Sequence, residues 1–342
     1  MKRLLARSAT ALLAAPLVLL AVQSSPGSIS ASAKAPSAAV VAQARTNFIK
    51  AMSAHAPAVG HGGWISPGVQ HRGALGGGNG TVTTAQSVNW SGYADAESAS
   101  KTVSSVSGDW TVPAVHCPPA PYQNQDAFLA NWVGIDGFGD STVEQLGTAT
   151  QCYEGVTYYY VWYEMYPAGT VEEGTTACIN DNVDCPEPGD HISASVSVTP
   201  AGSGENDYTL KLIDHTRPDE SFSVTQQCAA STCTDSSAEW IVERPATVLP
   251  FGLQILPLAD FRKTFFSRGD LASDGKVSSI QGFKDGPVYN IAMIDDTLSY
   301  YLACVDQPSP PGTLLTTSQT NACPAASPFR GGGFEESWNS SF

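Results

Sequence analysis

The sequence lacks the short motifs of most peptidases and metal enzymes. No GxSxG, HExxH or CxxC segment occurs in its 342 residues, and no Asp-Thr/Ser-Gly turn is present. These absences disfavour serine hydrolases of the nucleophile-elbow type, zinc enzymes and pepsin-like aspartic peptidases. We therefore expect neither a bound metal nor another cofactor.

Acidic residues are missing from the beginning of the chain. Residues 1–85 contain no Asp or Glu and seven of the 17 Lys and Arg residues, so all 32 acidic residues follow. The strongly acidic remainder argues against nucleic acid or an anionic membrane surface as a partner. Its self-repulsion falls as the carboxylates are protonated, which suits acid conditions. We expect a monomer.

Long apolar runs are also scarce. A basic start, an apolar run over 11–22 and the small-residue pattern Ala31-Ser32-Ala33 predict a signal peptide over 1–33 and an extracellular, secreted protein. The run contains Pro16 and is shorter than the roughly 20 residues of a membrane helix. The eight cysteines, all beyond this segment, are expected to form disulfides. Sequence alone permits about 105 pairings. We expect neighbours to pair: Cys117 with Cys152, Cys178 with Cys185, Cys228 with Cys233 and Cys304 with Cys323.

Residues 34–85 have the composition of a pro-segment. They are rich in Ala, Ser, Gly and His, include a helical stretch from about Pro36 to Ala54, and end in a Gly-rich connector. We expect this basic segment to lie across an acidic cleft as an intramolecular inhibitor, and to be released when acid protonates the cleft carboxylates. The alternative is a disordered linker without a role.

From residue 86 onward the chain has the pattern of an all-β domain. Short runs with period-2 alternation are separated by turns every 8 to 20 residues. This pattern predicts an antiparallel β-sandwich or barrel as one domain over 86–326, followed by a flexible Gly- and Ser-rich tail over 327–342. The expected strands include 102–112, 126–135, 157–166, 191–200, 207–215, 220–227, 238–243, 260–266 and 287–295.

Polar side chains lie on strand faces that would be apolar without a function. Alternation places Glu239 and Glu243 on one face of "AEWIVE" (238–243), and groups Trp162, Glu164 and Tyr166 in "WYEMYP" (162–167). Aromatic and carboxylate side chains on one sandwich face indicate a binding surface.

Five ordered motifs resemble those of the glutamic peptidases, the eqolisin group of acid endopeptidases. They are "NWSGYA" (89–94), "WVGIDG" (132–137), "EQLGT" (144–148), "WYEMYP" (162–167) and "AEWIVE" (238–243), and the resemblance covers about 86–300. It implies a concanavalin-like sandwich of two long antiparallel sheets and a pepstatin-insensitive activity on protein or peptide substrates in acid. It also implies Gln145 and Glu243 as the catalytic residues. Supporting residues near the cleft then correspond to Trp132, Asp136, Trp162, Glu164 and Tyr166, and Glu239 is a neighbour with an open role.

The chemistry fits these residue types. Glu243 would take a proton from the attacking water and return it, while Gln145 would hold the water and stabilise the oxyanion. The chain departs from fungal members of the family because "RPATVLPFGLQILP" (244–257) has no cysteine to close its hairpin, whereas "EGTTACINDNVDC" (173–185) has two.

Two other functions fit a concave sandwich face. A lectin-like carbohydrate-binding module would use the same aromatic and carboxylate side chains without catalysis. A glycosidase using Glu239 and Glu243 is disfavoured, because four residues of strand separate them by about 13 Å, beyond the roughly 5–9.5 Å that paired carboxyl groups need.

Overall fold

The structure is a computed structural model that describes residues 36–53, 64–71, 82–96, 102–118, 125–249, 252–280, 287–294, 301–306 and 333–338. The expected signal peptide over 1–33, most of the pro-segment after residue 53 and the expected Cys304–Cys323 pair lie outside the described residues or side chains. Within the described ranges, no helix has the length and apolar character needed to cross a bilayer.

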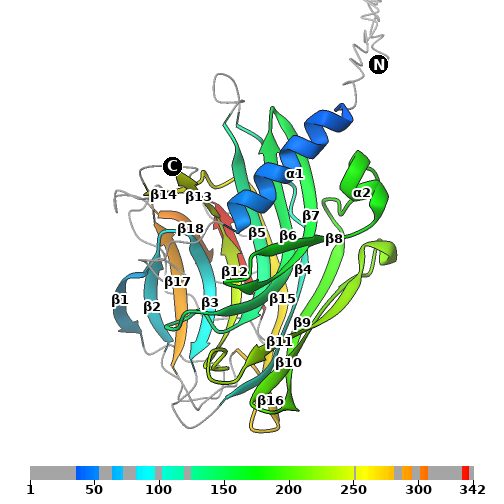
Figure 1. Ribbon diagram of the computed structural model, residues 1–342. Coiled ribbons are helices and arrows are strands. Elements are labelled where there is room, and N and C mark those ends of the chain that lie inside the picture. The colour runs from blue at the N-terminus through cyan, green and yellow to red at the C-terminus, as the bar shows by residue number, and fades with distance from the viewer. Residues whose placement is uncertain are drawn as a thin grey trace, which may run out of the picture. The chain divides into compact units, whose positions relative to one another are not determined.

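Two antiparallel sheets form a β-sandwich, as the sequence predicted (Figure 1). Neighbouring strands pair antiparallel except β2 and β17, which pair parallel, and an antiparallel β17–β18 pairing joins the sheets. The first sheet has the order β1 (Trp64–His71), β2 (Val82–Ser87), β17 (Val288–Ile294), β3 (Trp90–Ala96), β12 (Ser237–Glu243), β5 (Ala127–Ile135), β6 (Val143–Tyr153), β7 (Val156–Tyr166) and β8 (Thr170–Glu173). The second has the order β11 (Phe222–Ala229), β10 (Glu205–Asp214), β9 (His191–Gly202), β4 (Val103–Thr111), β15 (Lys263–Ser273), β19 (Phe334–Trp338) and β18 (Tyr301–Asp306), with β16 (Lys276–Ser279) pairing to β15.

The core between the sheets comes from alternate residues of both layers. Leu129 and Val133 of β5 and Trp240 of β12 pack in one cluster with Leu210 of β10 and Trp110 of β4. The Trp240 indole N–H also donates to the Ser107 carbonyl oxygen at 2.8 Å, so the buried ring is satisfied. Because these residues point inward, their neighbours on β5 and β12 point to the other face of the first sheet.

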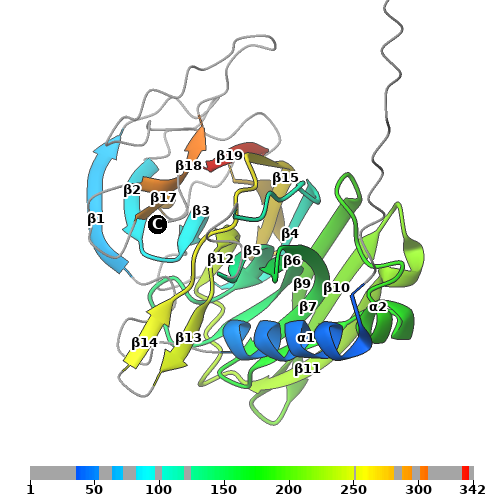
Figure 2. The same cartoon turned by 90° about the horizontal axis from the view of Figure 1, so that it is seen from above.

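That other face is covered in part by the predicted helix, α1 (Ala38–Met52). Ser37 caps its first turn by accepting from the Val40 amide. The apolar side of α1, which includes Phe48, packs in one cluster with Trp90, Trp132 and Trp162 of the sheet. Figures 1 and 2 show α1 lying across strands of the first sheet, and we call this surface the helix-covered face. The helix prediction over 36–54 is therefore confirmed.

Three of the four expected disulfides are formed, and they are Cys117–Cys152, Cys178–Cys185 and Cys228–Cys233. The second closes the loop after β8, which contains the short helix α2 (Thr176–Asp181). A one-turn 3-10 helix, η1 (Pro218–Glu220), precedes β11. The cysteine-free segment after Glu243 forms a hairpin of β13 (Ala246–Leu249) and β14 (Gly252–Ile255).

The expected flexible tail was wrong for residues 333–338. Residues 334–338 form β19, which pairs with β15 and β18. Phe334 is fully buried, stacking on Phe266 at 4.7 Å and meeting Tyr93 edge-on at 5.0 Å between ring centroids. Burial of this ring against two aromatic neighbours outweighs the loop-like composition of the Gly run before it.

Candidate active site

Glu243 ends β12 on the helix-covered face. Its Oε2 accepts a hydrogen bond from the Trp132 indole N–H at 2.8 Å, and its Oε1 accepts from the Asn89 side-chain amide at 3.1 Å. Asn89 is itself oriented, because the Ser87 hydroxyl donates to its Oδ1 at 3.0 Å. The carboxyl group is therefore held in one orientation while remaining partly exposed.

The surroundings of Glu243 favour its neutral form. Burial raises the pKa of Glu243 to about 8, the negative charge of Glu164 acts in the same direction, and hydrogen bonds from Trp132, Trp90 and Asn89 oppose the change. In acid this carboxyl group is therefore protonated. A carboxylic acid in this state offers one O–H donor and one acceptor oxygen.

Gln145 lies on β6, buried on the same face. Its Nε2 donates to Oε2 of Glu164 at 2.8 Å, and Oε1 of Glu164 accepts from the Thr170 hydroxyl at 3.0 Å. Its own Oε1 is buried and accepts no hydrogen bond from the described residues. Because β6 and β7 pair Gln145 directly with Glu164, this amide orientation follows from strand register.

Trp132 lies between Glu243 and Gln145 on the helix-covered face. By register, Glu243 is level with Ala130 on β5, and Gln145 is level with Gly134. The Trp132 indole reaches Glu243 with its N–H, while its Cζ3 would lie 3.0 Å from a Cβ at Gly134, a position also 3.2 Å from the Gln145 Cβ. The ring therefore needs glycine beneath it.

Glycine is needed at a second place, beside the backbone and Cβ of Trp132. A Cβ on Gly147 would lie 2.7 Å from the Trp132 Cβ and 2.0 Å from the Asn131 carbonyl oxygen. Trp90 meets Trp132 edge-on with ring centroids 4.9 Å apart. Strand packing on three sides thus fixes the indole that orients Glu243.

Asp136 lies against the loop before β12, away from Glu243 and Gln145. Its carboxylate accepts from the backbone amides of Thr234, Asp235 and Ser236 at 2.7, 2.9 and 2.6 Å. Burial and the nearby charge of Asp140 raise the pKa of Asp136 to about 7. In this structure its contacts hold the loop before β12.

Glu239 pairs with Gly134 of β5, which in turn pairs with Gln145 of β6. The three residues therefore lie in one row across the first sheet. It is fully buried, and burial together with the charges of Asp140 and Asp136 raises its pKa well above the usual range. Glu239 is thus aligned with the glutamine but enclosed, whereas Glu243 is partly exposed.

Trp162 and Tyr166, the two predicted residues that remain, lie on β7. Trp162 is fully buried in the cluster that includes Trp132, and Tyr166 lies partly buried at its edge. The structure therefore brings together Gln145, Glu243, Trp132, Trp162, Glu164 and Tyr166, while Asp136 contacts the loop and Glu239 is enclosed.

Comparison with known proteins identifies the family. A model described as the peptidase A4 family matches residues 88–304, which is more than half of the chain. The chain belongs to the peptidase A4 family. Aspergillopepsin-2 of Aspergillus niger is 28% identical over 232 residues, which cover 62% of this chain and 73% of that protein. The crystal structure of aspergilloglutamic peptidase from Aspergillus niger covers 62% of this chain and 99% of that chain, with 21% identity and a TM-score of 0.40.

Membership of the peptidase A4 family confirms the resemblance to glutamic peptidases and makes the chain a glutamic-type peptidase, a hydrolase of protein substrates. The comparisons do not favour the carbohydrate-binding alternative. The matched segment contains all five sequence motifs, and α1 precedes it.

Sequence reasoning did not assign three residues that position the candidate site. Asn89 binds Glu243 from a turn 154 residues away, and Thr170 binds Glu164. Arg244 is buried beside Glu243 and donates through Nε to the Val88 carbonyl oxygen at 2.8 Å, which fixes the end of β12 against that turn. Asn89 lies within a quoted motif, but local alternation carries no information about contacts between distant strands.

Proposed function

We propose that the chain is an acid endopeptidase in which Glu243 and Gln145 act directly on the peptide bond and the attacking water. The observation that supports this most is the pairing of an oriented, partly exposed carboxyl group with a buried amide on one sheet face. The Gln145 Oε1, which accepts no hydrogen bond from the described residues, is suited to bind the water.

The raised pKa defines the starting state of the reaction. Protonated Glu243 donates its proton to the substrate carbonyl oxygen while its other oxygen takes a proton from the water, whose oxygen bonds to the carbonyl carbon. The Oε1 of Gln145 holds the water, and its second amide N–H, not used by Glu164, donates to the substrate carbonyl oxygen as that oxygen receives the proton. This differs from the ionised base expected from the sequence.

The second step uses the same groups in reverse. Glu243 donates a proton to the leaving nitrogen and takes one from a hydroxyl of the tetrahedral intermediate, so the C–N bond breaks and the acid and amine separate. Glu243 ends protonated, as it began. The reaction therefore requires the protonated form of Glu243, and the rate falls as pH rises through its pKa.

The proposal includes α1 as the inhibitory part of a pro-segment. Phe48 is buried against the sheet, Arg45 forms a buried ion pair with Glu172, and the Ser53 hydroxyl oxygen accepts from the Thr170 amide at 3.0 Å. Thr170 also binds Glu164, the partner of Gln145, so three hydrogen bonds in sequence link the end of the helix to the proposed catalytic amide. Loss of the Arg45–Glu172 ion pair and of the Phe48 contact would accompany release of the helix.

Secretion as a precursor completes the proposal. Residues 1–33 would be the signal peptide and 34–85 the pro-segment, and the catalytic domain would run from about 86. This expected boundary falls inside β2, which pairs with β1 and with β17 of the first sheet, so the strands at 64–71 and 82–87 belong structurally to the sandwich. Because β19 belongs to the second sheet, this domain extends beyond the expected boundary at 326 to at least Trp338.

Digestion of a denatured protein by the full chain across pH 2 to 7, with and without pepstatin, tests the proposed function. We expect cleavage in acid that pepstatin does not block, and none by Glu243→Gln. A complete absence of cleavage together with sugar binding would select the carbohydrate-binding alternative.

A further inference from the structure

We infer that Tyr160, Glu172 and the Cys178 carbonyl form a substrate subsite for an arginine side chain. In the precursor Arg45 occupies this subsite, and in the active enzyme a substrate arginine takes its place. The inference rests on the proposed function and extends it to a class of substrate.

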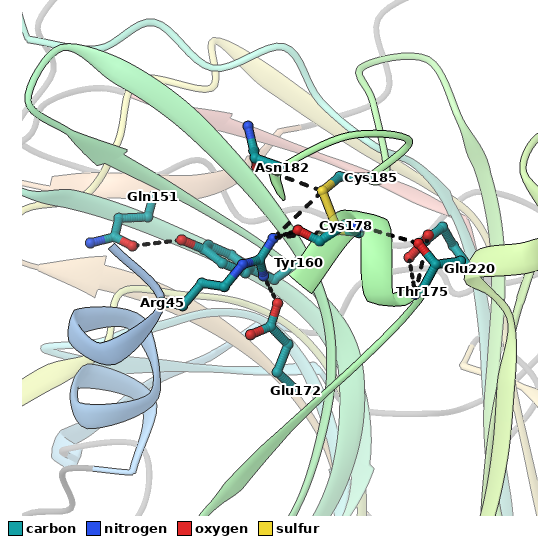
Figure 3. A network of polar contacts seen from close by, with 9 residues as sticks. All are labelled: Arg45, Gln151, Tyr160, Glu172, Thr175, Cys178, Asn182, Cys185 and Glu220. Atoms are coloured by element: carbon teal, nitrogen blue, oxygen red, sulfur yellow. Dashed lines mark hydrogen bonds and ion pairs between the residues drawn. A yellow bond between two sulfur atoms is a disulfide. The ribbon is translucent and has the colours of Figure 1, made fainter. Parts of the chain in front are cut away.

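The contacts of Arg45 describe the subsite (Figure 3). Its guanidinium forms an ion pair with Glu172, donates to the Cys178 carbonyl oxygen and lies 5.0 Å from the centroid of the Tyr160 ring. The side chains of Arg45 and Glu172 are 7% and 8% exposed. A carboxylate, a carbonyl and an aromatic face together match the planar donors and the charge of guanidinium.

The catalytic domain itself builds this subsite. The Cys178–Cys185 disulfide closes the loop, and the Thr175 hydroxyl accepts from the Cys178 amide at 3.1 Å. The Tyr160 hydroxyl donates to Oε1 of Gln151 at 2.8 Å, which fixes the ring from below α1. None of these contacts involves α1, so we expect the geometry to persist after the helix leaves.

Departure of Arg45 leaves the subsite with unmet interactions. Glu172 loses its cation and the Cys178 carbonyl loses a donor, so both oxygens are free to accept from another guanidinium. A lysine would supply the charge, but it lacks the planar fork that reaches both oxygens. Arginine is therefore the side chain that this subsite fits best.

Strand register gives the distance between the arginine subsite and the peptide bond that is cleaved. Tyr160 is level with Ala149, which is level with Ala130, which is level with Glu243. Three strand spacings of about 4.8 Å separate Tyr160 from Glu243 by about 14 Å. An extended peptide rises about 3.3 Å per residue, so the arginine should lie about four residues from the cleaved bond.

The test measures kcat/KM for a set of fluorogenic peptides that share one scissile bond. Arginine is placed three, four or five residues away on either side, and glutamine replaces it in each reference peptide. The enzyme is the full chain after incubation in acid, as wild type, Glu172→Gln and Glu173→Gln. Glu173 is the matched control, because adjacent strand residues point to opposite faces.

We expect the wild type to prefer one arginine peptide over its glutamine reference by about tenfold to a hundredfold, mainly through KM, as a hydrogen-bonded charge pair would give. Glu172→Gln should lose this preference, and Glu173→Gln should keep it. Equal cleavage of both peptides by the wild type, or a preference that survives in Glu172→Gln, overturns the subsite. If Glu172→Gln does not fold, the comparison of arginine and glutamine peptides with the wild-type enzyme is sufficient to test the subsite. Absence of all cleavage would instead overturn the proposed function, and the subsite with it.

Discussion

Phe48 is the residue of α1 whose loss should most accelerate activation. Its side chain is fully buried, and its ring stacks on Tyr160 with centroids 4.0 Å apart and planes inclined by 2°. Truncation of a buried phenylalanine to alanine costs about 3–5 kcal/mol. The lower figure suits a helix packed on one side, and about 3 kcal/mol corresponds to roughly a hundredfold increase in the released population.

The assay follows the appearance of activity after transfer of the full chain from neutral to acid pH. If cleavage of the pro-segment is slower than helix docking, the activation rate follows the released population. Phe48→Ala should then shorten the lag by up to about a hundredfold. Thr46→Ala is the control, because Thr46 is exposed and its hydroxyl bonds within the helix, to the Ala42 carbonyl oxygen at 2.8 Å.

Two results would refute this reasoning. An unchanged lag in Phe48→Ala would mean that docking of α1 does not limit activation. An equal shortening of the lag by Thr46→Ala would mean that the effect does not come from contact of the helix with the sheet.

Two further predictions concern the site and its pH dependence. Gly134→Ala should lower kcat about tenfold or more with KM nearly unchanged, because the added Cβ would displace the Trp132 ring; a normal kcat would show that the ring position is unimportant. The melting temperature should fall as pH rises from about 4 to 7, since folded Asp136, with its raised pKa of about 7, keeps a proton that the unfolded chain releases above its usual pKa of 3.8. Asp140→Asn removes the neighbouring charge and should flatten this slope, and an unchanged slope would contradict that cause.

The sequence predicted those parts of the fold and site that depend on local alternation. The faces of β5, β7 and β12 follow from period 2, so the grouping of Trp162 with Glu164 and the separation of Trp240 from Glu243 were predictable. The helix at 38–52 was predictable from its own amphipathic pattern, which is also a local property of the sequence.

Contacts between distant segments were not predictable in this way. The bond between Asn89 and Glu243 depends on the pairing of β3 with β12, and the ion pair of Arg45 with Glu172 depends on where α1 docks. Alternation also could not rank Glu239 against Glu243, because it assigns both to one face and says nothing of depth. The family resemblance supplied that ranking, and the enclosure of Glu239 supports it.

The pH dependence of kcat/KM for Glu243→Gln, Glu239→Gln and the wild type tests the central claim most directly. With folding checked by circular dichroism, Glu243→Gln should lose about a thousandfold or more at every pH, as expected for an essential acid–base group. The wild-type rate should fall as pH rises through the Glu243 pKa, and Glu239→Gln should retain most of the activity. Full activity in Glu243→Gln, or a large loss confined to Glu239→Gln, would contradict the assignment.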